Sequence, residues 1–295
     1  MNFGRIVTAM VTPFDQNGQV DVEATKKLVH HLITNGTDAI VVAGTTGESP
    51  TLSTEEKILI IKTTVEAANG KIPIIAGTGS NNTQASIELT KQAEELGVDG
   101  IMLVTPYYNK PSQEGLYQHF KVIAESTKLP VMLYNIPGRS AVNLDVETTL
   151  RLTEISNIVA IKEASGDLEA MATIIEHTPE DFSLYSGDDS LTLPILSIGG
   201  IGVVSVASHI VGNEMQQMVR NYLGGQVQAA AMQHRQLLPI MKALFKAPNP
   251  TPVKAALEMK GLEVGSVRLP LIPLTLEQQQ QLQSVIQPSI NYFVS

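Results

Sequence analysis

Eight short apolar runs recur along the first part of this sequence, and each is followed by a stretch with the spacing of an amphipathic helix. The runs are continuously apolar, so each is expected to be a strand buried on both faces in a parallel sheet. Eight strand-then-helix units close naturally into a (β/α)8 TIM barrel. The runs lie at residues 6–11, 39–43, 72–76, 100–104, 131–134, 158–161, 182–185 and 203–206.

An open, doubly wound sheet is the competing architecture for alternating strands and helices. That fold would carry a glycine-rich dinucleotide turn directly after its first strand. The first apolar run here is followed instead by Thr12-Pro13-Phe14-Asp15, a turn without glycine. The sequence therefore favours the closed barrel.

Helix boundaries are marked by capping residues and by Asn-Gly pairs. Ser53 and Glu56 have the spacing of a capping box, and Asn69-Gly70 marks the end of the helix that they begin. The other helices predicted within the barrel span residues 21–33, 83–96, 113–126, 145–155, 168–177 and 188–196.

The strand pattern stops at about residue 224, and the rest of the chain has the pattern of helices joined by proline-rich loops. Helices are predicted over 226–245, 253–260 and 277–286, and Pro252 is well placed to begin the second of them. The glutamine run of the last helix is interpreted as a solvated face. We therefore divide the chain into a barrel (residues 1–224) and a C-terminal helical appendage (residues 225–295).

Composition excludes several classes of function. A formal net charge of −9 disfavours nucleic-acid binding, which needs a basic face. The absence of cysteine excludes a thiolate nucleophile, a disulfide and a cysteine-ligated metal. No apolar run approaches the ~20 residues that span a bilayer, and the N-terminus lacks the pattern of a signal peptide, so a cytoplasmic location is expected.

Lys162 ends the sixth apolar run, at the C-terminal tip of the strand that the run predicts. An amine held there, partly out of water, loses proton affinity and becomes a nucleophile toward carbonyl groups. The alternative is a charge that marks where the chain reaches the surface, with Glu163 as its exposed partner.

Other chemically useful residues also follow strand ends, which is where barrels carry their sites. Strands five and six are neighbours, so Tyr134 and Lys162 are expected to face one space, where a tyrosine can shuttle protons. Each candidate also has an ordinary role, as a core tyrosine, a loop anchor, a subunit contact or a surface charge. The candidates are Thr45, Thr46, Tyr107, Tyr108, Tyr134, Arg139, Lys162, Gly187 and Asp188.

The segment Gly44-Thr45-Thr46-Gly47 is similar to a backbone nest for anions. It lacks the lysine of a phosphate loop, which favours a small carboxylate over a nucleotide. Asp188-Asp189 is better explained by helix capping than by a metal pair. The six histidines show no ligand spacing, so neither a metal nor an organic cofactor is expected.

Three motifs occur together in this chain: Gly44-Thr45-Thr46-Gly47-Glu48, Tyr134-Asn135-Ile136-Pro137 and Lys162-Glu163-Ala164-Ser165. Jointly they resemble the signature of the class I, pyruvate-dependent aldolase/lyase family, and the resemblance covers the whole chain, including the helical tail. The double threonine and Gly138-Arg139 favour a condensing synthase of this family over N-acetylneuraminate lyase.

The resemblance implies a reaction and a set of roles. Pyruvate forms a Schiff base with a lysine, and the resulting enamine attacks L-aspartate 4-semialdehyde, a step of lysine and diaminopimelate synthesis. The residues that the resemblance makes catalytic are Lys162, for the Schiff base, and Tyr134, Thr45 and Tyr108, for a proton relay with Tyr108 from a neighbouring subunit. The residues that it makes substrate-binding are Thr46 for pyruvate, Arg139 for the semialdehyde carboxylate, and the backbone carbonyls of Gly187 and Val204.

One departure from the family pattern concerns regulation. Members inhibited by lysine carry His and Glu side chains in a cleft between subunits, and the matching positions here are Lys57 and Ala85, whereas Ser49, Asn81 and Tyr107 are retained. A lost carboxylate would leave the α-amine of bound lysine unpaired, so weak or absent lysine feedback is predicted. The resemblance also implies a homotetramer built as a dimer of dimers, and a dimer at least.

The residues disfavour two other functions. A pyruvate-dependent aldolase for a sugar acid or a hydroxy acid is disfavoured by Arg139 and by the second threonine. A non-catalytic barrel that senses a metabolite is disfavoured by the acidic charge and by the complete lysine–tyrosine pair.

Overall fold

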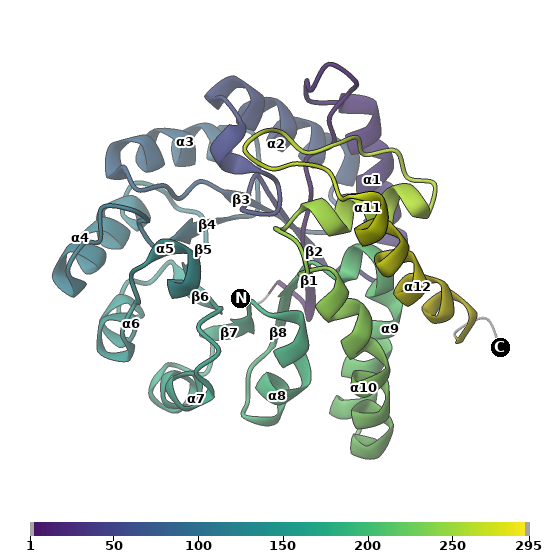
Figure 1. Ribbon diagram of the computed structural model, residues 1–295. Coiled ribbons are helices and arrows are strands. Elements are labelled where there is room, and N and C mark those ends of the chain that lie inside the picture. The colour runs from purple at the N-terminus through teal and green to yellow at the C-terminus, as the bar shows by residue number, and fades with distance from the viewer. Residues whose placement is uncertain (1–2, 293–295) are drawn as a thin grey trace.

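The computed structural model describes the backbone of residues 3–292 and the side chains as far as residue 287. Met1 and Asn2 of the N-terminal segment and residues 293–295 of the predicted appendage therefore lie outside the described residues. Eight parallel strands form one closed barrel in the order of the sequence (Figure 1), which confirms the predicted fold class. The strands are β1 (Ile6–Ala9), β2 (Ala39–Val42), β3 (Ile74–Gly77), β4 (Gly100–Val104), β5 (Val131–Asn135), β6 (Ile158–Glu163), β7 (Ser183–Ser186) and β8 (Gly202–Ser205).

The strands are apolar throughout because each contributes to two cores. One set of side chains, which includes Val41, Met132 and Tyr134, fills the inside of the barrel. The alternate set, which includes Ile40 and Leu133, packs outward against the helices. Successive residues of a strand point to opposite faces, so burial on both faces requires an unbroken apolar run.

Helices surround the barrel in Figure 1, and most of their boundaries match the sequence prediction. The Ser53–Glu56 capping box is present, and Asp21 caps its helix through a bond from the backbone N–H of Ala24. The barrel helices are α1 (Val22–Thr34), α2 (Thr54–Ala68), α3 (Thr83–Glu95), α4 (Gln113–Ala124), α5 (Pro137–Ser140), α6 (Val146–Leu152), α7 (Leu168–His177), α8 (Thr192–Ser197) and α9 (Ser208–Leu223), with short 3-10 helices η1 (Ser49–Thr51) and η2 (Asp189–Leu191).

One local prediction needs correction. The single helix expected over 188–196 is split into η2 and α8, because the Asp189 side chain turns inward to accept hydrogen bonds from the backbone N–H groups of Val206 and Ala207. After β5, Pro137 begins a short helix, α5, that the sequence pattern did not indicate. That helix carries Arg139.

As far as residue 292, three helices form the C-terminal part of the chain: α10 (Val227–Ala243), α11 (Thr251–Met259) and α12 (Leu276–Tyr292). In Figure 1, α10 lies alongside α9, the last helix of the barrel ring. The glutamines at 278, 280, 281 and 283 are exposed, as expected for a solvated face. No helix within residues 3–292 is long and apolar enough to cross a membrane.

Candidate active site

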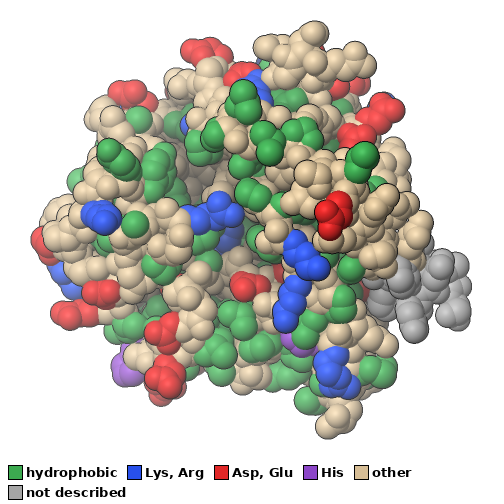
Figure 2. All heavy atoms as spheres, in the orientation of Figure 1, with side chains coloured by type: hydrophobic (Ala, Val, Ile, Leu, Met, Phe, Trp, Pro, Cys, Tyr) green, Lys and Arg blue, Asp and Glu red, His purple; other side chains and the backbone are tan. Residues whose placement is uncertain are grey.

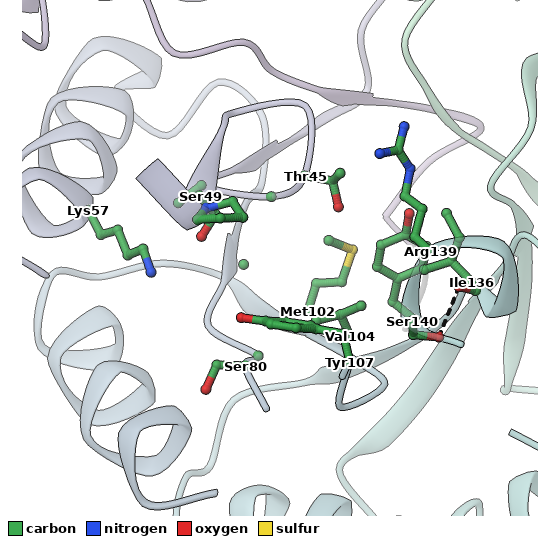
Figure 3. Close-up of a pocket in the computed structure, with 16 residues that line it drawn as sticks. Thr45, Ser49, Lys57, Ser80, Met102, Val104, Tyr107, Ile136, Arg139 and Ser140 are labelled. Atoms are coloured by element: carbon green, nitrogen blue, oxygen red, sulfur yellow. Dashed lines mark hydrogen bonds between the residues drawn. The ribbon is translucent and has the colours of Figure 1, made fainter. Parts of the chain in front are cut away.

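A cavity of about 220 Å³ lies at the C-terminal ends of β2 to β5 (Figure 3). Figure 2 shows this face of the molecule hollowed at its centre, with Lys and Arg side chains at the edge of the hollow. Two of the described residues that line the cavity are charged, Lys57 and Arg139, and both are cations. They lie on opposite sides of it (Figure 3). In a protein of net charge −9, such a lining favours an anionic ligand.

Tyr134 and Lys162 are direct neighbours across β5 and β6. The Lys162 Nζ atom lies 4.0 Å from the centre of the Tyr134 ring, and both side chains are buried. Tyr134 lines the cavity, whereas Lys162 is not among the lining residues. The structure thus brings together the two residues that sequence reasoning placed in one space.

Glu163 is not an exposed partner of Lys162, and that alternative is wrong. Its side chain is buried and accepts hydrogen bonds from Asn135 Nδ2 at 3.0 Å and from the Ser165 backbone N–H at 2.7 Å. Burial raises the pKa of Glu163, and these bonds oppose the rise. Successive strand residues point to opposite faces, so Glu163 points away from the barrel interior while Lys162 points into it. The carboxyl group thus links the C-terminal ends of β5 and β6 on the side that faces away from the barrel interior.

Gly187, which directly follows β7, lies close to Lys162 on the neighbouring strand β6. A Cβ atom on Gly187 would clash with Ala164 Cβ at 2.5 Å and would lie in tight contact with Lys162 Cε at 3.2 Å. Val204 is buried inside the barrel in the same cluster as Tyr134. Position 187 therefore requires glycine for steric reasons, independently of any backbone contact with a ligand.

The two threonines of the segment after β2 have different surroundings. Thr45 is half-buried and lines the cavity, whereas Thr46 is buried and its Oγ1 atom accepts a hydrogen bond of 3.0 Å from Asn249 Nδ2. Ala43 and Glu48 flank these threonines, and both have a φ of 56°. The left-handed region is unfavourable for residues other than glycine, so contacts from outside must hold this turn in shape.

Arg139 is exposed on α5 and reaches the cavity wall. The one-turn helix is held by Ser140 Oγ, which donates to the Ile136 carbonyl at 2.9 Å (Figure 3). Tyr108 behaves differently from the other candidates, because it is 89% exposed and does not line the cavity. The described chain brings Tyr107 to the cavity and leaves Tyr108 outside it.

Asp188 and Asp189 do not form a metal pair. Asp188 accepts from the Ser190 backbone N–H at 2.8 Å and so caps η2, while Asp189 is buried and bonded to the segment after β8. Burial raises the pKa of Asp189. Among the residues that the structure describes, no group of three His, Cys, Asp or Glu side chains could hold a metal ion.

Sequence reasoning missed a second set of residues, from the C-terminal appendage. Asn249 contacts Thr46, and Lys254 and Arg268 both contact Glu48, the last residue of the first motif. The proline-rich segment around Asn249 indicated a stiff loop, but nothing in the sequence indicated its target. These contacts join the appendage to the turn that carries the two threonines.

The closed barrel and the buried lysine beneath a tyrosine define the protein as a (β/α)8-barrel enzyme with a central lysine. More specifically, the chain belongs to the dihydrodipicolinate synthetase family, whose model matches residues 2–289. This confirms the resemblance that the three sequence motifs carry.

Individual relatives agree with this assignment. The chain is 72% identical to 4-hydroxy-tetrahydrodipicolinate synthase 1 of Halalkalibacterium halodurans, over all of both chains. A crystal structure of a dihydrodipicolinate synthase from Bacillus anthracis is 61% identical, with a TM-score of 0.96 over 97% of this chain and 98% of that one. A chloride-inhibited dihydrodipicolinate synthase from Acinetobacter baumannii, solved with pyruvate, is 43% identical, with a TM-score of 0.94 over 97% and 98%.

Proposed function

We propose that this protein condenses pyruvate with L-aspartate 4-semialdehyde to give 4-hydroxy-tetrahydrodipicolinate, in lysine and diaminopimelate biosynthesis. The observation that carries the proposal is the buried pair of Lys162 and Tyr134, 4.0 Å from amine to ring centre, beside a cavity whose charged lining residues are cations. The family and its 72% identical relative support the same reaction.

In the first half of the reaction, the Lys162 amine attacks C2 of pyruvate and forms a carbinolamine. Loss of water gives the imine, and Tyr134, with Thr45 and a Tyr108 from a neighbouring subunit, moves the protons that this step requires. The pyruvate carboxylate is held at the Thr45–Thr46 turn, and the backbone carbonyls of Gly187 and Val204 face the intermediate.

In the second half, loss of a proton from the pyruvate methyl group gives an enamine, whose carbon attacks the aldehyde of the second substrate. Arg139 holds the carboxylate of that substrate, because a guanidinium can bind a carboxylate through two parallel hydrogen bonds. The amino group of the condensed product then attacks the imine carbon and releases Lys162. One water leaves overall, and no external cofactor takes part.

The test is to incubate the protein with pyruvate, reduce any imine with borohydride and measure the mass of the protein. We expect the mass of one reduced pyruvate on Lys162, no adduct on Lys162→Ala, and an unchanged adduct on Lys91→Ala, which alters an exposed lysine on α3. No adduct on the unaltered chain would refute every imine mechanism. An adduct without consumption of aspartate semialdehyde would favour an aldolase for a sugar acid or hydroxy acid.

We further propose that the chain acts as a dimer at least, and as a homotetramer built from two dimers, in the cytoplasm. Tyr108 supports this, because its side chain is 89% exposed and does not line the cavity of its own chain, which suits a role in the site of another chain. We also propose residues 1–224 as the catalytic barrel and 225–295 as a C-terminal helical domain. Sedimentation equilibrium, which measures the number of chains in the assembly, tests the proposed oligomeric state.

A further inference from the structure

Two hydrogen bonds join the C-terminal appendage to the turn that carries Thr45 and Thr46. Asn249 Nδ2 donates to Thr46 Oγ1 at 3.0 Å, and both side chains are buried. Two residues further along the turn, Glu48 Oε2 accepts from the Arg268 backbone N–H at 2.9 Å. The proposed pyruvate-binding turn thus depends on a segment from the other end of the chain.

The direction of the Asn249 bond decides what the Thr46 hydroxyl can do. A threonine hydroxyl has one hydrogen to donate and lone pairs with which to accept. Because its oxygen accepts from the Asn249 amide, its single hydrogen remains available for another acceptor. A carboxylate is an acceptor only, so this arrangement makes Thr46 a donor suited to a substrate carboxylate.

We propose that Asn249 is a positioning residue for pyruvate, because it occupies the acceptor side of Thr46 and thereby directs the Thr46 O–H toward the substrate carboxylate. This inference rests on the proposed function. It assigns the appendage a part in substrate binding, in addition to its packing on the barrel.

Two substitutions at position 249 should affect pyruvate binding in an unequal way. Asn249→Asp keeps the shape of the side chain but replaces a donor by an acceptor. The Thr46 hydroxyl should then donate its hydrogen to the aspartate and not to the substrate, and the added negative charge should repel the substrate carboxylate. Asn249→Ala removes the bond but leaves the hydrogen free. Binding of pyruvate should therefore suffer more from the isosteric change than from the truncation.

The experiment measures steady-state constants for both substrates, with borohydride trapping of pyruvate and thermal unfolding as controls on each variant. We expect KM for pyruvate to rise at least tenfold in Asn249→Asp and by a smaller factor in Asn249→Ala. We expect kcat to change less than KM, and KM for the semialdehyde to stay within about twofold. Asn213→Asp, which adds the same charge at an exposed asparagine on α9, should leave all constants unchanged.

Two further results decide the proposal. In a Thr46→Val background, which has no hydroxyl to direct, the difference between Asp and Ala at position 249 should shrink to the effect of charge alone. If Asn249→Asp binds pyruvate as well as Asn249→Ala or better, Asn249 does not direct the hydroxyl and the inference fails. If the unaltered protein traps no pyruvate, the proposed function itself has failed, so the two failures are distinguishable.

Discussion

Lys254 and Glu48 form an ion pair inside the protein, with Nζ 2.9 Å from Oε1 and with side chains that are 3% and 1% exposed. The ammonium group also donates to the Ser266 carbonyl at 2.8 Å and lies 4.1 Å from the centre of the Phe14 ring. Glu48 Oε1 meets Lys254 as an ion pair without the geometry of a hydrogen bond. This pair joins the appendage to the end of the turn that carries Thr45 and Thr46.

Removing one partner of this pair should destabilise the fold. Lys254→Met leaves a buried carboxylate without its cation, and breaking a buried pair on one side destabilises a protein by about 3 kcal/mol or more. Urea unfolding followed by circular dichroism measures the loss. The double variant Glu48→Gln/Lys254→Met leaves no unpaired charge buried, so it should recover most of the stability. A double variant as unstable as the single one would contradict this account.

The same lysine should give the protein a pH-dependent stability. Burial lowers the pKa of Lys254 to about 8, and this effect exceeds the opposing one of Glu48. Arg268 lowers the pKa further and Glu258 raises it. In the unfolded chain the pKa of a lysine is about 10.4, so between these values the unfolded state binds more protons at this site.

Stability from this site therefore rises with pH between about 8 and about 10.4, by at most ~1.4 kcal/mol per pH unit. The measurement is the free energy of unfolding of the unaltered protein minus that of Lys254→Met, followed from pH 7.5 to 10. The subtraction removes the titration of other groups. A difference that stays flat or falls with pH would show that Lys254 is not held with a lowered pKa.

Tyr134→Phe should slow imine formation without displacing the lysine. The phenylalanine ring still covers Lys162 Nζ, but the hydroxyl that we propose moves protons is lost, which we expect to lower the rate of trapping by about 10²-fold. Stopped-flow or quenched trapping with pyruvate measures it. Tyr185→Phe is the matched control, because Tyr185 also lies beside Lys162 in the strand register while its hydroxyl bonds to Phe3 and Gly4. An equal loss of rate in both variants would indicate a packing effect.

Lysine should inhibit this enzyme weakly or not at all. Lys57 projects into the cavity from α2 (Figure 3), and no carboxylate pairs with it among the described residues. Burial lowers its pKa. A second ammonium group would meet a cation there, and Ala85 offers no carboxylate in exchange. Initial rates at increasing lysine concentration measure the effect, and an inhibition constant in the micromolar range would refute the prediction.

Tyr108 should act across a subunit boundary. Chains with Tyr108→Phe and chains with Lys162→Ala are each expected to have little activity alone. In a mixed dimer, one of the two sites has both an intact Lys162 and an intact Tyr108 from the other chain, so unfolding and refolding the mixture should restore part of the activity. Tyr108 in a loop with a φ of 74° is held in an unusual backbone conformation, which is consistent with a defined role. A mixture that stays as inactive as its components would place Tyr108 in its own chain's site or outside catalysis.

Much of this architecture follows from local pattern. Strands buried on both faces must be apolar throughout, so the eight runs identified the barrel, and the barrel identified which residues stand at strand ends. Tyr134 and Lys162 could be paired from the sequence because consecutive strands of such a barrel are neighbours. The Ser53–Glu56 box could be predicted because a cap involves residues only three positions apart.

Local pattern could not predict which of the charged and polar residues at strand ends and outside the strands are buried. Glu48, Glu163, Lys254 and Asn249 all have the character of surface residues in sequence, because such side chains are seldom buried without partners. Here the partners of Glu48 and Asn249 come from segments distant along the chain, and only the closing of the barrel and the return of the appendage bring them together. The sequence by itself determined the barrel and its lysine, because these depend on periodicity and chain order. The tertiary structure alone decided how the threonine turn is held, because that depends on burial and on contacts between the two ends of the chain.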